Sequence, residues 1–204
     1  MHKKTLCLGG SFNPIHHGHL ICARAVAESV GFDRVLLIPS AKPPHKPDAT
    51  DLADAAHRLH MCRLAIETDR KGVGVQFEVS DIEIARANQL SYTIDTVRQL
   101  KSHGWEYVHW LIGADMLNSL PTWREAAALL REVEFVVMAR PGIPIDWNSL
   151  PSEFSFLQKH VVPAPLLDIS SSMIRQRIKS GLDISYLTPP AVVDYIRSLN
   201  LYRV

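Results

Sequence analysis

The segment of the chain richest in chemically capable residues reads Gly9-Gly10-Ser11-Phe12-Asn13-Pro14-Ile15-His16-His17-Gly18-His19. It follows a short apolar run and predicts a strand, a glycine turn and a helix that opens at Gly18 and His19. Glycines let backbone approach a ligand closely, and a helix N-terminus offers unpaired N–H groups to an anion. His16 and His19 are three residues apart, so both imidazoles can face a bound phosphate and donate to its oxygens. The segment predicts a phosphate site.

Other chemistries of this segment are weaker but remain open at this point. It lacks the Gly-x-Gly-x-x-Gly spacing of dinucleotide-binding turns and the Gly-Lys-Ser/Thr of a Walker A loop. Three histidines in four positions could bind a metal, but no cysteine or acidic residue lies nearby to complete a ligand set, so we expect no protein-bound metal. A plain helix cap with exposed histidines explains the segment about as well as an anion site.

The elements that must position these residues alternate along the chain. Strands are expected at Thr5–Leu8, Arg34–Pro39, Val73–Val79, Tyr107–Ile112, Phe135–Ala139 and Val161–Pro163. Helices are expected around residues 20–30 and 59–66, after a cap at Ser91, and at Trp123–Val133, Ser171–Lys179 and Ala191–Leu199. Several strands are apolar throughout, as in strands buried on both faces. This alternation predicts an α/β, Rossmann-like, doubly wound, mostly parallel sheet with helices on both faces.

Composition sets limits on domain number and on partners. The 204 residues are 47% hydrophobic, with 22 Lys+Arg against 21 Asp+Glu and a net charge of +1. We expect one domain over residues 1–204, with the C-terminal helical part from about 165 to 204 as a sub-region. Near-neutral charge argues against nucleic acid as a partner, and no apolar run approaches the ~20 residues that span a bilayer, so no membrane partner is expected. With no signal-like leader and three cysteines outside any Cys-x-x-Cys pair, a cytoplasmic protein is expected.

Several segments together resemble bacterial nicotinate-nucleotide adenylyltransferases, in the superfamily with the His-x-Gly-His motif. The first loop carries that motif, and Pro39-Ser40-Ala41-Lys42-Pro43-Pro44-His45-Lys46 resembles the family's Pro-x-x-x-Pro-Pro-His-Lys loop. The segments that also match, in the family's order, are 56–61, 91–96, 113–115, 140–142 and 169–175. The resemblance therefore covers nearly the whole chain.

The resemblance implies adenylyl transfer from ATP to nicotinate mononucleotide, giving nicotinate adenine dinucleotide and pyrophosphate. The attacking phosphate is already ionised near neutral pH and Mg²⁺ arrives with the ATP phosphates, so positioning and charge neutralisation are the main requirements. The implied catalytic residues are His16, His19 and Arg175. The implied ATP-binding residues are Gly9, Gly10, Ser11, Phe12, Gly18, Gly113, Asp115, Ser171 and Ser172. The implied nicotinate mononucleotide-binding residues are Asn13, His45, Lys46, Tyr92, Thr93, Trp123 and Arg140.

Residue by residue, alternatives accompany these roles. Ser171 and Ser172 could simply cap a helix, and Trp123 without the resemblance would be read as a core residue. Asn13 stands where many family members have Asp, which puts in doubt any role that needs a negative charge there. For the whole chain, the alternatives are a nicotinamide mononucleotide or phosphopantetheine adenylyltransferase, or a non-catalytic nucleotide sensor. The sequence leaves open whether the chain forms a homo-oligomer and whether the 39–49 loop acts as a lid.

Overall fold

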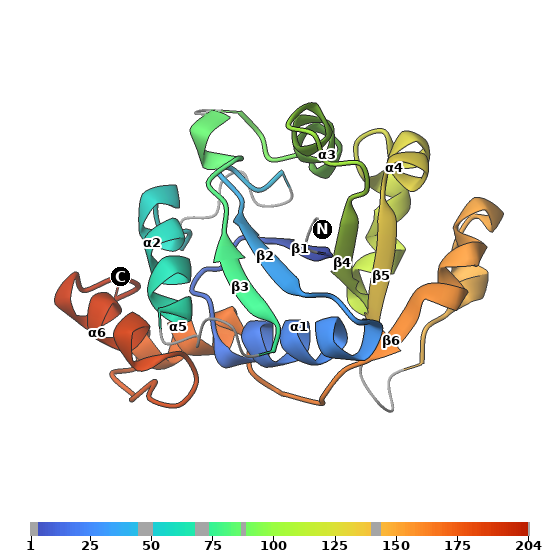
Figure 1. The fold of residues 1–204 in the computed structure, drawn as a ribbon. Helices are drawn as coiled ribbons and strands as arrows, with labels where there is room; N and C mark the ends of the chain where they lie inside the picture. The colour runs from blue at the N-terminus through green and yellow to red at the C-terminus, as the bar shows by residue number, and fades with distance from the viewer. Residues whose placement is uncertain (1–3, 45–50, 68–73, 87–88, 140–143, 204) are drawn as a thin grey trace.

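A computed structural model describes residues 4–44, 51–67, 74–86, 89–139 and 144–203. These residues form a six-stranded, entirely parallel sheet in the order β3-β2-β1-β4-β5-β6 (Figure 1). The strands are β1 (Thr5–Gly10), β2 (Arg34–Pro39), β3 (Gln76–Val79), β4 (His109–Gly113), β5 (Glu134–Ala139) and β6 (Val161–Pro163). Because β1 pairs with both β2 and β4, the order reverses beside β1, and the crevice at the carboxyl ends of β1 and β4 is where such sheets bind ligands.

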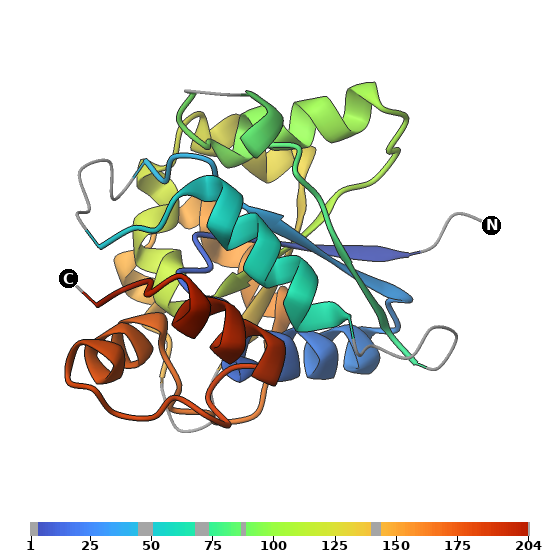
Figure 2. The ribbon, with the colours of Figure 1, turned by 90° about the vertical axis from the view of Figure 1, so that its left-hand side faces the viewer.

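Helices cover both faces of this sheet (Figures 1 and 2). The α-helices are α1 (His17–Val30), α2 (Ala55–Ile66), α3 (Thr93–Ser102), α4 (Ala126–Glu132), α5 (Ser171–Lys179) and α6 (Pro190–Ser198). Short 3₁₀ segments are η1 (Ile84–Arg86), η2 (Ala114–Thr122), η3 (Trp147–Ser149) and η4 (Ser152–His160). This is the doubly wound α/β architecture predicted from the sequence.

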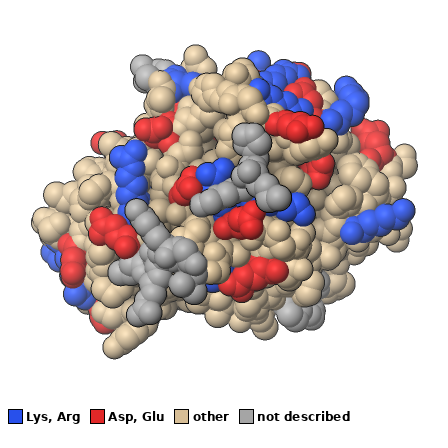
Figure 3. All heavy atoms as spheres, in the orientation of Figure 1, with Lys and Arg blue, Asp and Glu red and all other residues tan. Residues whose placement is uncertain are grey.

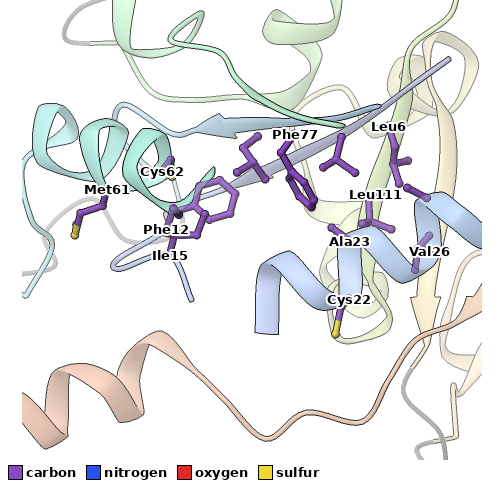
Figure 4. Close-up of a cluster of buried hydrophobic side chains, with 14 of the residues drawn as sticks. Leu6, Phe12, Ile15, Cys22, Ala23, Val26, Met61, Cys62, Phe77 and Leu111 are labelled. Atoms are coloured by element: carbon purple, nitrogen blue, oxygen red, sulfur yellow. The ribbon is translucent and has the colours of Figure 1, made fainter. Parts of the chain in front are cut away.

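Two hydrophobic clusters hold the layers together, and neighbouring residues of one strand point into different clusters. In β1, Leu6 belongs to the cluster under α1, α2, α5 and α6, whereas Cys7 belongs to the cluster under α3, α4, η2 and η4. Figure 4 shows part of the first cluster, where Phe12 and Ile15 of the first loop pack close to α2. The loop that carries the histidines is thus anchored by its own apolar residues, which are at most 1% exposed.

The predicted element boundaries are close to those observed, with two informative errors. Ser91 does not cap α3: the N-cap residue is Tyr92, and the Ser91 hydroxyl instead accepts a hydrogen bond from the Ala41 N–H at 2.8 Å. The helix predicted at Trp123–Val133 begins only at Ala126. Trp123 has extended backbone and Glu125 lies in the left-handed region (φ 52°), so neither can belong to the helix.

The C-terminal part returns to the first loop. Tyr202 donates its hydroxyl proton to Oδ1 of Asn13 at 2.8 Å, and α6 packs against α2.

Acidic and basic side chains are interspersed on the face shown in Figure 3. In the described ranges, no helix combines the length and apolar character needed to cross a bilayer. The prediction of one domain with a C-terminal sub-region stays a prediction.

Candidate active site

The first loop leaves the sheet at Gly10 and enters α1 at His17. Position 9, near the end of β1, requires glycine, because a Cβ there would lie 2.6 Å from the indole of Trp110 on the neighbouring strand β4. Phe12 adopts a left-handed backbone (φ 45°), which is unfavourable for an aromatic residue and is maintained by its complete burial. Its ring meets the ring of His19 edge-on, with centroids 5.1 Å apart.

His16 and His19 lie together at the N-terminus of α1. Their rings stack with centroids 3.7 Å apart and planes 27° apart. The His16 backbone N–H donates to Nδ1 of His19 at 3.3 Å, so that nitrogen carries no proton and the ring proton of neutral His19 sits on Nε2. Burial, and then the neighbouring His16, lower the pKa of His19 well below its ordinary value. His19 is therefore a neutral imidazole that can donate one hydrogen bond from Nε2.

Arg175 reaches this loop from α5. Its Nη1 donates to the Asn13 carbonyl at 2.8 Å, and its Nε donates to the Asp51 carboxylate at 2.9 Å. Arg175 is only 9% exposed, so this charge is held close against the loop. Asp51 was not predicted as a partner, because nothing in the sequence relates it to a residue 124 positions away.

Ser170, Ser171 and Ser172 at the start of α5 make different contacts, although the sequence assigned capping or phosphate binding to Ser171 and Ser172 alike. Ser170, not Ser171 or Ser172, caps the helix by accepting from the Met173 N–H at 3.2 Å. The Ser171 hydroxyl donates to the Pro14 carbonyl at 2.8 Å and so ties α5 to the first loop. Ser172 is exposed on the helix.

Asn13 is 4% exposed, and both ends of its side-chain amide are engaged. Nδ2 donates to the Asp51 carbonyl at 2.8 Å, while Oδ1 accepts from the Ala53 N–H at 3.0 Å and from Tyr202. Only an amide can donate and accept in this way at neutral pH. The residue at which the chain departs from the family's usual Asp therefore joins the first loop to the segment before α2 and to the C-terminus.

A cavity of about 370 Å³ opens at the switch point between β1 and β4. Predicted residues from both substrate groups line it: Gly9, Gly10, Ser11, Tyr92, Thr93, Gly113 and Trp123. It is also lined by residues that the sequence did not single out for this site: Ser40, Pro43, Pro44, Glu83, Trp110, Met116 and Arg124. Three of these, Ser40, Pro43 and Pro44, belong to the Pro-rich loop that the resemblance singled out, and Trp110 is the neighbour that requires glycine at position 9.

Aromatic and charged side chains form one wall of the cavity. The Trp123 Nε1–H lies 3.4 Å from the Ser119 hydroxyl, which fixes the indole orientation. The guanidinium of Arg124 sits over the Tyr92 ring, 4.8 Å from its centroid. Buried Glu83 accepts a hydrogen bond from Thr96 at 2.6 Å, and burial raises the pKa of its carboxyl. A flat aromatic ring can be held here next to the glycine turn.

The remaining predicted residues are placed as follows. His16, His19, Asn13, Ser171 and Arg175 do not line the cavity but meet along the same first loop. Asp115 is exposed at the start of η2, and Gly18 faces the His16 ring, which would lie 3.0 Å from an added Cβ. His45, Lys46 and Arg140 lie outside the described residues. Among the residues described, no three His, Cys, Asp or Glu side chains gather to hold a metal ion.

Comparisons with known proteins agree with this geometry. The sequence model of the cytidylyltransferase-like family matches residues 7–177. The chain is 43% identical over 198 residues to a protein of Roseiflexus sp. (strain RS-1) named "Probable nicotinate-nucleotide adenylyltransferase", covering 96% of each chain. A Streptococcus pyogenes protein of the same name is 41% identical, over 98% of this chain and 89% of that protein. The chain belongs to the nicotinate-nucleotide adenylyltransferase family.

A solved structure shares the fold of this family member. Nicotinic acid mononucleotide adenylyltransferase of Plasmodium falciparum, complexed with NaAD, aligns with a TM-score of 0.76 at 21% identity, covering 98% of both chains. As a nicotinate-nucleotide adenylyltransferase family member, the chain is a nucleotidyltransferase enzyme with a Rossmann-like fold. The resemblance read from its motifs is confirmed.

Proposed function

We propose that the chain joins the adenylyl group of ATP to the 5′-phosphate of nicotinate mononucleotide. A phosphate oxygen of the mononucleotide attacks the α-phosphorus of ATP in line, a new P–O–P bridge forms, and pyrophosphate leaves. The observation that carries the proposal is the aromatic-walled cavity, formed by Tyr92 and Trp123, which opens directly onto the glycine turn of the His-x-Gly-His loop. One substrate ring and one reacting phosphate can thus be bound side by side.

The residues of the loop fit the charge that develops in this reaction. Neutral His19 offers its Nε2–H, the N-terminus of α1 offers its partial positive charge, and His16 stacks against His19. One well-placed donor of this kind is worth about 2.7–4 kcal/mol in the transition state. We assign His16 and His19 to the α- and β-phosphates and Arg175 to the departing pyrophosphate, with Arg175 exchanging or sharing its contact with Asp51 when the nucleotide binds.

Mg²⁺ is proposed to enter as part of the ATP complex. It would neutralise charge on the leaving pyrophosphate, held by phosphate oxygens and water. The donor set in the described residues fits this assignment, because it offers hydrogen-bond donors around the loop and no carboxylate cluster.

We further propose a cytoplasmic location, supported by three buried, unbridged cysteines, and no nucleic-acid or membrane partner.

Pyrophosphate release tests the proposed reaction directly. Purified protein is mixed with Mg-ATP and either nicotinate or nicotinamide mononucleotide, and initial rates are compared. Rapid release with the acid and much slower release with the amide is expected, since a site built from donors leaves an amide poorly paired. Comparable rates with both would contradict acid selectivity. Release only with phosphopantetheine, or ATP binding without release, would replace the proposal with another acceptor or with a sensor.

A further inference from the structure

Arg58 is a charged residue with no exposed surface, buried on α2 below the cavity-forming loops. Its guanidinium makes three hydrogen bonds, and all three go to backbone carbonyls. Nη1 donates to Ser11 at 2.7 Å, Nη2 to Ala41 at 2.9 Å and Nε to Ala53 at 2.8 Å. Burial lowers the pKa of Arg58 from its ordinary value, and Asp54 and Glu83 partly offset this effect. Burying a charge costs free energy of folding, and here the guanidinium is hydrogen-bonded to neutral carbonyls, which suggests a role beyond stability.

The three carbonyls belong to three different segments. Ser11 is on the first loop, Ala41 is on the Pro-rich loop after β2, and Ala53 lies just before α2. Ser11 itself lines the cavity, as do Ser40 and Pro43 on either side of Ala41. The other backbone group of Ala41, its N–H, donates to the Ser91 hydroxyl at 2.8 Å. The two loops leave neighbouring strands, and the Ser40 N–H donates to the Gly10 carbonyl at 2.9 Å where they begin. Beyond that point, one guanidinium joins the first loop, the Pro-rich loop and the segment before α2.

We propose that Arg58 is a positioning residue that holds the two substrate-binding loops in register for phosphoryl attack. This inference rests on the proposed function, which assigns the histidines of the first loop to the ATP phosphates, and on the family resemblance, which implies that the Pro-rich loop binds the mononucleotide. In-line attack requires the reacting atoms about 3–3.5 Å apart, and a displacement of about 1 Å can cost 10²-fold in rate. Arg58 touches neither reacting group, so its contribution is the geometry of the ternary complex and not the binding of either substrate.

Lysine cannot replace arginine in this arrangement. The planar fork of the guanidinium reaches three carbonyls in fixed directions, whereas an ammonium is a compact point charge that also loses its proton more readily when buried. Arg58→Lys therefore retains a long aliphatic side chain but breaks the link between the loops. Met61→Ala is the matched control: Met61 is fully buried one turn further along α2, belongs to the hydrophobic cluster and does not line the cavity.

Steady-state kinetics and melting temperatures are measured for wild type and both variants. For Arg58→Lys we expect kcat to fall about 10- to 100-fold while KM for each substrate changes less than about threefold. Met61→Ala should lower the melting temperature but keep kcat within about twofold. An unchanged kcat in Arg58→Lys, or an equal kcat loss in Met61→Ala, overturns the proposal.

Amide hydrogen exchange tests the same link without any activity. The Ala41 N–H bonds to Ser91 and the Ala53 N–H bonds to Asn13, so both amides report on the linked segments. They should exchange at least about tenfold faster in Arg58→Lys than in Met61→Ala. Equal exchange in the two variants overturns the positioning role. A wild-type enzyme that releases no pyrophosphate would contradict only the proposed function, because exchange still decides the role of Arg58.

Discussion

The backbone N–H of His16 donates to Nδ1 of His19, and the two imidazole rings stack 3.7 Å apart. This pairing uses one nitrogen of His19 for structure and leaves the other for a ligand. The hydrogen bond is half of a capping box, in which the side chain of the third helical residue accepts from the N-cap N–H, and it fixes the orientation of the His19 ring. Nδ1 of His19 therefore has a structural role and Nε2 is left to bind a ligand, and different substitutions can remove the one or the other.

His19→Gln and His19→Asn should differ in activity. A glutamine amide can reach the position of Nε2 and donate there, whereas an asparagine amide reaches only the position of Nδ1. We expect kcat to fall about 10²- to 10³-fold in His19→Asn, as when one transition-state donor is lost, and distinctly less in His19→Gln. Single-turnover rates with Mg-ATP and nicotinate mononucleotide measure this. Equal losses in both variants would contradict donation from Nε2.

The stability of the protein should fall in mildly acidic solution. Burial and His16 lower the pKa of His19 in the folded state, whereas the unfolded chain takes up this proton near pH 6.5. As pH decreases below about 6.5, the unfolded state binds more protons, and stability falls by up to about 1.4 kcal/mol per pH unit for one histidine. Burial also lowers the pKa of His17, so it acts in the same direction.

Urea unfolding at pH 7.5 and 5.5 isolates the contribution of His19. The loss of unfolding free energy on acidification should be smaller in His19→Gln than in wild type, because glutamine does not titrate. His17→Gln serves as the comparison for the partly exposed ring of His17, whose pKa burial also lowers. Equal losses of unfolding free energy in wild type and His19→Gln between these pH values would contradict a lowered pKa of His19 in the folded state.

The sequence predicted what depends on local patterns. The apolar run at Arg34–Pro39 matches β2 residue for residue, because a strand buried on both faces shows little polar alternation. Val161–Pro163 matches β6, a partly exposed edge strand, through its two β-branched valines. The His16–His19 spacing likewise placed both rings at one helix end. Long-range polar partners were not predictable: Arg58 bonds to carbonyls, which every residue possesses, and so leaves no trace in the sequence. Ser91 looked like a helix cap because the pattern of a cap is local, whereas its actual partner is Ala41.

Asn13→Asp should destabilise the protein even though many family members have Asp there. A carboxylate cannot donate to the Asp51 carbonyl, and it would face that carbonyl oxygen at hydrogen-bond distance. We expect a loss of about 1–3 kcal/mol in unfolding free energy, the cost of leaving a buried group unsatisfied. Chemical denaturation at pH 7.5 measures this. Tyr202→Phe, which removes a different partner of Asn13, should cost less, since Ala53 still donates to Oδ1; the reverse order would contradict the role given to the amide.

Trp123→Ala should weaken binding of the mononucleotide more than binding of ATP. The indole lines the cavity beside Tyr92, is held by Ser119 and offers a flat face to a pyridine ring. Loss of one aromatic stacking partner is worth about 0.5–1.5 kcal/mol beyond buried area, so KM for nicotinate mononucleotide should rise about tenfold or more while KM for ATP changes little. Trp105→Ala is the control, because Trp105 lies beside Arg34 at the opposite end of the strands and away from the cavity. A rise in KM for ATP alone would place the nucleotide base, not the pyridine ring, against Trp123.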